Sequence, residues 1–191
     1  MTKDFIADLK SRHDAYAAGR RAIIEKSSVA QHAAKRAIFA AQRGDVDGVQ
    51  KLISEASDAI AEARKAAVVN PRLSCEGSLR AAMEEYAEAA TFIMLLENGQ
   101  AGPIDSFDEE TLIGGLCDAV GELVRMMIIL ATSHQDEEVA RLKGIADEVV
   151  GGLNTMDFSG YLRTKFDQAK NHLRKAEEVM YDVSLRGRSR A

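Results

Sequence analysis

The stretch Leu112–Thr132, "LIGGLCDAVGELVRMMIILAT", is apolar around almost the whole circumference of a helix. Such a helix lies either in a membrane or at the centre of a soluble helical bundle. Asp118, Glu122 and Arg125 interrupt the apolar run, and each ionised group would cost about 2.5–3.5 kcal/mol at the centre of a bilayer. We therefore predict the central helix of a soluble bundle and no association with a membrane.

The composition predicts an all-α protein. Only 5% of the 191 residues are aromatic, with 2 prolines and no tryptophan, so the chain is poor in the residues that fill β-sheets. The net charge of -5 excludes a protein that is basic throughout, so a polyanionic partner must be held by a local basic surface. Cys75 and Cys117 match no zinc spacing and, with no apolar secretory signal at the N-terminus, favour a reducing, cytoplasmic compartment.

Helix start and stop signals predict six to seven helices in an up-down bundle. One domain is expected over residues 1–187, with a basic disordered tail at 188–191. The expected helices are one long or two abutting helices ending at 44–45, then 45–69, 75–96, the helix of the opening stretch, 135–150 and 159–185. Ser106 with Glu109 predicts a capping box before the opening stretch, and Gly151–Gly152 predicts the end of the helix that follows it.

The two carboxylates inside the apolar stretch are the candidate site. Asp118 and Glu122 are four residues apart, so they lie on one face of the helix about one turn from each other. Two like charges in an apolar setting need a cation between them, or one is protonated. The alternatives are a salt bridge to Arg125 or to a base on a neighbouring helix, or a polar strip that reaches solvent.

A second acidic pair lies on another apolar helix. Glu85 and Glu88 are three residues apart within "RAAMEEYAEAATFIMLL". Two helices that each offer a pair of inward carboxylates can form an all-oxygen cage, which suits Mg²⁺ or Mn²⁺ rather than zinc. The spacing alone is a weak signal, because glutamate pairs at this spacing are common on exposed helix faces.

Several segments resemble the translin and translin-associated factor X (TRAX) family. "LRTKFDQAKNHLRKAEEVMYDVSLRG", Leu162–Gly187, is similar to the C-terminal signature of the family. "EEYAEA", Glu84–Ala89, and "CDAVGELVRM", Cys117–Met126, resemble "QEYVEA" and "ADLTGELMRM" of the TRAX branch. "AAKRAIFAAQRGD", Ala33–Asp45, resembles the N-terminal "SKRAIFxLHR" segment of the family. The similarity extends over residues 25–187.

The resemblance implies a fold, an assembly and an activity. It implies a seven-helix α fold, a closed homo-octameric shell, and single-stranded RNA, or single-stranded DNA, held inside. In the TRAX branch acidic residues bind magnesium and cut RNA. Matching the motifs places Glu85 and Glu88 at the acidic positions of "EYVEA" and Asp118 and Glu122 at those of "DLTGE". The resemblance therefore implies a TRAX-like protein with these four residues as metal-binding and catalytic groups.

The basic residues are candidates for contacts with RNA phosphates. The candidates from the first half of the chain are Lys35, Arg36, Arg43, Arg72 and Arg80, of which Arg80 lies a little over one turn from Glu84 and Glu85. The last helix adds Arg163, Lys165, Lys170, Arg174 and Lys175. Ala41-Gln42-Arg43 stands where the family has Leu-His-Arg, so an RNA contact by that histidine is absent here.

Three functions use acidic pairs on neighbouring helices or the architecture that the resemblance implies. The first is a Mg²⁺-dependent endoribonuclease acting on single-stranded RNA, in which one carboxylate, such as Glu122, serves as general base. The second is an oligomer of the same architecture that binds single-stranded RNA or DNA without cutting it. The third, a di-metal oxidoreductase, requires Glu-x-x-His motifs, and the positions three residues after Glu85 and Glu122 are Glu88 and Arg125. The third is therefore disfavoured.

Overall fold

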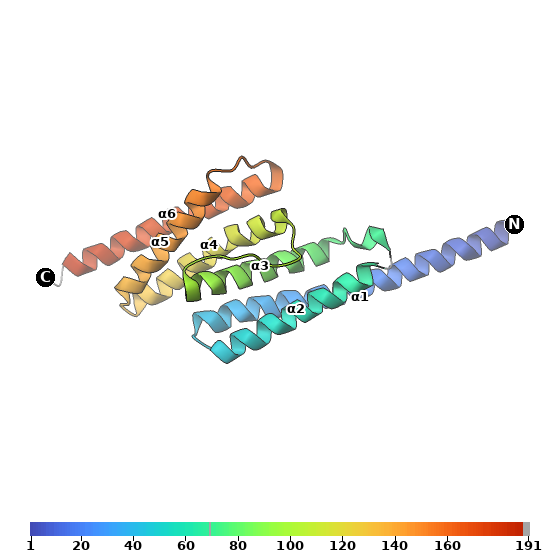
Figure 1. Cartoon of the computed structure of the whole chain (residues 1–191), viewed down its shortest axis with the longest axis horizontal. Helices are drawn as coiled ribbons and strands as arrows, with labels where there is room; N and C mark the ends of the chain where they lie inside the picture. Colours follow the sequence, from blue (N-terminus) through green and yellow to red (C-terminus); the bar gives the residue numbers. More distant parts are fainter. Residues whose placement is uncertain (69, 189–191) are drawn as a thin grey trace. The chain divides into compact units, whose positions relative to one another are not determined.

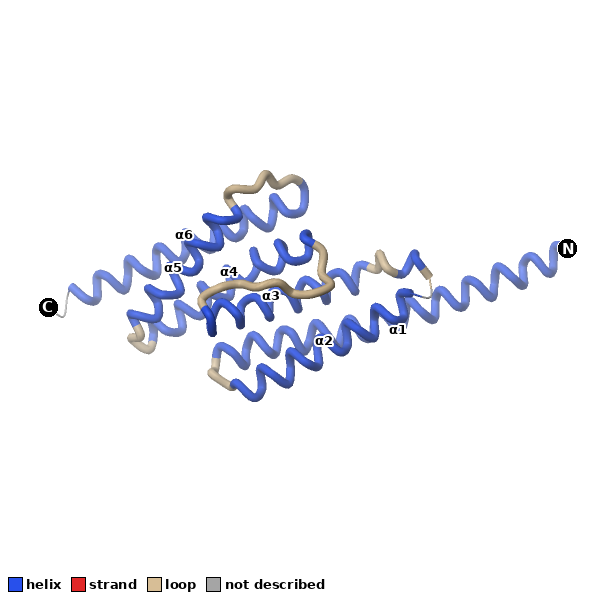
Figure 2. The backbone as a smooth tube through the Cα atoms, in the orientation of Figure 1, coloured by secondary structure: helices blue, strands red, loops and turns tan. Residues whose placement is uncertain are grey.

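The computed structural model describes residues 1–68 and 70–188, and all regular secondary structure in this range is helical (Figures 1 and 2). The elements are α1 (Thr2–Gln42), α2 (Val46–Val68), the 3-10 helix η1 (Pro71–Leu73), α3 (Gly77–Asn98), α4 (Glu109–Thr132), α5 (Asp136–Leu153) and α6 (Gly160–Arg188). The prediction of an all-α fold with six to seven helices is confirmed. Within these ranges no helix is both long and apolar enough to cross a membrane.

Two predicted helix boundaries are wrong. The N-cap of α4 is Asp108, whose side chain accepts a hydrogen bond from the Thr111 amide at 2.8 Å, and Ser106 lies in the preceding loop. Aspartate and serine are equally good caps, so sequence spacing could not decide between them. Helix α5 continues through Gly151–Gly152 to Leu153, whose burial favours these three further helical residues.

The helices form two compact units. Among the described residues, the first contains those of Met1–Ala40 and Asp45–Tyr86, and the second contains Ala41–Gly44 and residues 87–188. A single domain over 1–187 stays a prediction. Helix α6 includes Arg188, the first residue of the predicted tail, and residues 189–191 lie outside the described part of the chain.

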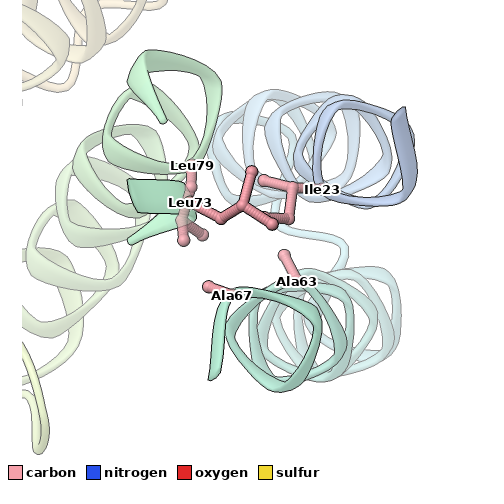
Figure 3. Close-up of a cluster of buried hydrophobic side chains, with 5 residues drawn as sticks. All are labelled: Ile23, Ala63, Ala67, Leu73 and Leu79. Carbon is pink, nitrogen blue, oxygen red and sulfur yellow. The ribbon is translucent and has the colours of Figure 1, made fainter. Parts of the chain in front are cut away.

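The first unit has its hydrophobic core where η1 meets α1 and α2 (Figure 3). Asn70 caps η1 by accepting a hydrogen bond from the Arg72 amide, and Pro71 fixes the backbone of its first turn. This geometry buries Leu73 against Ile23 of α1 and Ala63 of α2. The short turn after α2 is therefore part of the core of this unit.

The second unit is built around α4, which packs against both α5 and α6 (Figure 1). The buried residues of α4 extend from Thr111 to Ala131 and include Val120, Leu123 and Met127. The prediction that this helix is central is therefore confirmed within this unit. Figure 2 shows the loop between α3 and α4 returning alongside α3 before α4 begins.

Gly115 sets how closely α3 and α4 approach. A Cβ atom on Gly115 would lie 2.7 Å from the Cβ of Ala87 and 2.7 Å from the backbone nitrogen of Glu88. Both distances are far below van der Waals contact, and the second involves backbone that has no rotamer to adjust. A side chain at this position would therefore force the two helices apart.

We expect Gly115→Ala to lower the free energy of unfolding by about 1–3 kcal/mol, the usual cost of adding volume to a packed core. Gly144→Ala is the matched control, because Gly144 also lies inside a helix but has no atom within 4 Å of its added Cβ. There the better helix propensity of alanine should stabilise the protein by up to about 1 kcal/mol. Urea unfolding followed by circular dichroism measures both changes, and equal effects of the two variants would contradict the close approach at Gly115.

Candidate functional site

Asp118 of α4 is joined to α6 by an ion pair. The Lys165 ammonium donates a hydrogen bond to the Asp118 carboxylate, and the two side chains are only 26% (Asp118) and 16% (Lys165) exposed. Partial burial strengthens the attraction between the two charges, and loss of either partner would leave the other charge half-buried and unpaired. Asp118 therefore has a cationic partner from a neighbouring helix, one of the alternatives that its sequence context left open.

Glu122, one turn further along α4, is held by an amide. Its Oε2 accepts a hydrogen bond from Nε2 of the buried Gln42 at 2.5 Å, and Nη1 of Arg125 lies 3.9 Å away. Gln42 stands where the N-terminal signature that this segment resembles has a histidine. The substituted position therefore faces a predicted site residue, a relation that no sequence spacing reveals.

The acids of α3 fall in different units. Glu85 belongs to the first unit, where Nζ of Lys35 on α1 lies 3.1 Å from its carboxylate. Glu88 belongs to the second unit, is half-buried, and has its backbone nitrogen against Gly115 of α4. Glu88 therefore stands where α3 and α4 come closest, one helical turn before the level of Asp118.

The carboxylates are not gathered around a common point in this structure. Across residues 1–68 and 70–188, no group of three or more histidine, cysteine, aspartate or glutamate side chains is arranged to hold a metal ion. The donors are of the hard oxygen type that Mg²⁺ prefers. An ion at Asp118 would, however, have to replace the Lys165 ammonium, so the chain neutralises part of this cluster with its own bases.

The predicted RNA-binding residues of the first half of the chain are all exposed. Lys35 is paired with Glu85, and Arg80 also takes part in an interaction. Arg36 and Arg43 form no ion pair within the described residues. These two guanidinium groups are therefore the cations of this set that are most available to a polyanion.

The cations of α6 are largely balanced by neighbours on the same helix. Hydrogen bonds from Lys170 and Arg163 lower the pKa of Asp167 below its ordinary value, with Lys170 the larger cause. The hydrogen bond to Glu178 likewise raises the pKa of Lys175. Lys165 differs from these residues because its partner, Asp118, lies on another helix.

Beside Lys165, one face of α6 carries two groups that the sequence did not single out, Tyr161 and His172. Nζ of Lys165 lies 5.4 Å from the ring centroid of Tyr161, one turn earlier on the helix. Two turns later the His172 ring rests on α4, with Nε2 only 3.1 Å from the position of a Cβ on Gly121. The helical spacing of positions 161, 165 and 172 predicts that they share one face of α6, and Gly121 predicts a close neighbour of α4. Neither pattern shows that this face of α6 packs on Gly121.

Comparisons with known proteins agree with this fold. Residues 105–187, less than half of the chain, match the model of the Translin family. Translin of Gallus gallus is 28% identical over 81 residues, which are 42% of this chain and 35% of that relative. The alignment therefore spans about a third of the length of that protein.

Solved structures match over nearly the whole chain. The crystal structure of apo-NeC3PO has a TM-score of 0.86 at 17% identity, covering 93% of this chain and 96% of that one. A complex of AfC3PO with duplex RNA has a TM-score of 0.85 at 17% identity, covering 94% and 96%. Identity this low shows a shared fold, and the Translin family signature lies in the segment from the loop before α4 to the end of α6.

We expect Lys165→Met to lower the free energy of unfolding by roughly 1.5–3 kcal/mol, because it leaves the half-buried Asp118 carboxylate without its charged partner. Lys175→Met is the matched control on the same helix, since its pair with Glu178 is mostly exposed, and its change should stay within about 0.5 kcal/mol. Chemical unfolding of both variants measures the difference. In the Asp118→Asn background the cost of Lys165→Met should shrink, and an undiminished cost would show that the lysine acts through packing alone.

Proposed function

We propose that this protein is a Translin-family protein of the TRAX-like branch, which binds single-stranded RNA and cleaves it as a Mg²⁺-dependent endoribonuclease. The family signature at 105–187 supports the family assignment. The presence of all four acids, Glu85, Glu88, Asp118 and Glu122, supports the branch. A structural neighbour in complex with duplex RNA supports RNA as the class of ligand.

The close approach at Gly115 is the observation that carries the catalytic part of the proposal. It places the backbone of Glu88 directly against α4, and Asp118 lies three residues beyond Gly115 on that helix. Both carboxylates are therefore within about one helical turn, roughly 5 Å along the axis, of the crossing point. Glu85 and Glu122 extend the acidic positions by one turn on each helix.

Each residue has a role in this proposal. Glu85, Glu88, Asp118 and Glu122 would hold Mg²⁺, or Mn²⁺ in its place. A bound ion of this kind neutralises phosphate charge and lowers the pKa of a coordinated water. The Lys165 ammonium, once released from Asp118, would bind a phosphate oxygen of the RNA. Glu122, oriented by the amide of Gln42, would accept a proton as general base.

Binding of the RNA chain would use the exposed cations. Arg36, Arg43, Arg80 and Lys35 would contact phosphates, which makes affinity fall with salt concentration. Single-stranded DNA offers the same phosphates and bases and would bind as well. A closed homo-octamer located in the cytoplasm completes the proposal. Exposed apolar side chains on α1 and α4, among them Phe5, Ile6, Ile128 and Ile129, offer surface for subunit contacts.

A non-catalytic oligomer that only holds single-stranded RNA or DNA is the second candidate. A specific observation favours it: Lys165 pairs with Asp118, Lys35 pairs with Glu85, and Gln42 binds Glu122. The two lysines compensate the charges of Asp118 and Glu85, and the amide satisfies an oxygen of Glu122, so these acids have partners without a metal ion. Such a protein would bind RNA with the same dependence on salt and would release no product with any divalent cation.

Incubation of the purified protein with an end-labelled, unstructured RNA separates the two candidates. We expect cleavage with Mg²⁺ and none with EDTA. Glu88→Gln and Asp118→Asn should reduce the cleavage rate to the EDTA background, because each removes an anionic oxygen donor while keeping the size of the side chain. Neither variant should lose affinity for RNA, measured in EDTA, because neither removes a cation that contacts phosphate.

Glu97→Gln is the control, because Glu97 lies on the same helix as Glu88 but is exposed at its C-terminal end. This variant should cleave at the wild-type rate. Tight RNA binding without any Mg²⁺-dependent product would refute the nuclease and establish the second candidate. Cleavage that survives both Glu88→Gln and Asp118→Asn would refute the assignment of the acids.

A further inference from the structure

Tyr161 is exposed at the start of α6. Its side chain lies in the first turn of the helix, and the residue is 45% exposed. The apolar contact at this end of the helix is made by other rings, because Phe158 and Phe166 pack at a centroid distance of 5.3 Å and Phe166 is buried. The phenol ring of Tyr161 is therefore not the side chain that closes the core here.

A single ammonium connects this ring to the acidic cluster. Nζ of Lys165 lies 5.4 Å from the centroid of the Tyr161 ring and also donates to the carboxylate of Asp118. The ring, the ammonium and the carboxylate are thus consecutive neighbours. The solvent-exposed ring of Tyr161 and the predicted metal-binding carboxylate of Asp118 are thus linked by a shared neighbour, the Lys165 ammonium.

This combination fits one nucleotide of a single-stranded chain. Unpaired bases stack on exposed aromatic side chains, and each such contact contributes roughly 1–3 kcal/mol without selecting a particular base. An adjacent cation can take the phosphate that follows the base. His172, two turns further along the same face, adds an exposed polar ring beside Gly121.

We propose that Tyr161 is a base-stacking residue, which binds one base of a single-stranded RNA and places the neighbouring phosphate at Lys165 beside Asp118. The inference rests on the RNA binding of the proposed function but not on cleavage. Tyr161 is a binding residue here, and it takes no part in bond breaking. A ring that served only to hold the Lys165 side chain in place by a cation–π contact would have no effect on bases.

The chain supplies its own matched control. Tyr181 also lies on α6 and is 64% exposed, but it is twenty residues further along, roughly 30 Å at the rise of an α-helix. Replacement of either tyrosine removes an exposed phenol from the same helix. Only Tyr161 has the contact with Lys165.

The test measures binding of a short oligouridylate in EDTA, so that no cleavage interferes. We expect Tyr161→Ala to weaken the affinity by roughly 5- to 100-fold, the loss that corresponds to one stacked base. Tyr161→Phe should retain the wild-type affinity, because its ring still stacks, and Tyr181→Ala should have no effect. The slope of log K against log salt should stay unchanged in Tyr161→Ala, since stacking releases no counterions, and should become shallower in Lys165→Met.

Tyr161→Trp keeps the test valid if Tyr161→Ala is unstable, and an abasic ligand tests whether the base itself is the group bound. The chain has no tryptophan, so Tyr161→Trp introduces a single reporter whose emission should be quenched when RNA binds. Oligouridylate with abasic positions should bind wild type and Tyr161→Ala equally. Wild-type binding combined with an unaffected Tyr161→Ala, or with no quenching in Tyr161→Trp, would overturn the stacking proposal alone. Absence of wild-type binding would overturn the proposed RNA binding and the stacking together.

Discussion

The contact between Gly115 of α4 and the backbone of α3 at Ala87 and Glu88 is the constraint on which the candidate site depends. Helices whose contact residues carry side chains pack 8–10 Å apart, and a glycine at the crossing allows a closer approach. This approach places Glu88 beside the helix that carries Asp118 and Glu122. If the two helices were further apart, the carboxylates of α3 and α4 would be too far from each other to share one cation.

The charges at this crossing are balanced by the protein itself. Lys165 of α6 is paired with Asp118, and Gln42, the last residue of α1, donates a hydrogen bond to Glu122. Asp118, neutralised by a lysine, and Glu122, hydrogen-bonded by a neutral amide, can remain half-buried with no metal ion bound. In the proposed function this arrangement would respond to RNA, because a phosphate would compete with Asp118 for Lys165 while a divalent cation would compete with Lys165 for Asp118.

Sequence patterns predicted the elements of this fold better than its contacts. The apolar run of α4 predicted a central helix because burial on several sides leaves a clear signal in composition. The motifs also placed the acids on two helices. The partners of those acids were not predictable, because Lys165 lies 47 residues from Asp118 and Gln42 lies 80 residues from Glu122. The residues that approach Gly115 and Gly121 could not be predicted either. A glycine in a helix is consistent with a close neighbour, but the sequence does not identify that neighbour.

The central claim is that the acids at the α3–α4 crossing can release their internal partners and hold one hard cation together. Titration of the intact protein with Mn²⁺, followed by the electron paramagnetic resonance signal of the free ion, measures this directly and needs neither RNA nor turnover. The claim predicts saturable Mn²⁺ binding that Mg²⁺ competes away and that Glu88→Gln with Asp118→Asn abolishes in a folded protein. A titration in which Mn²⁺ stays free, or in which the double variant binds it as wild type does, would contradict the claim.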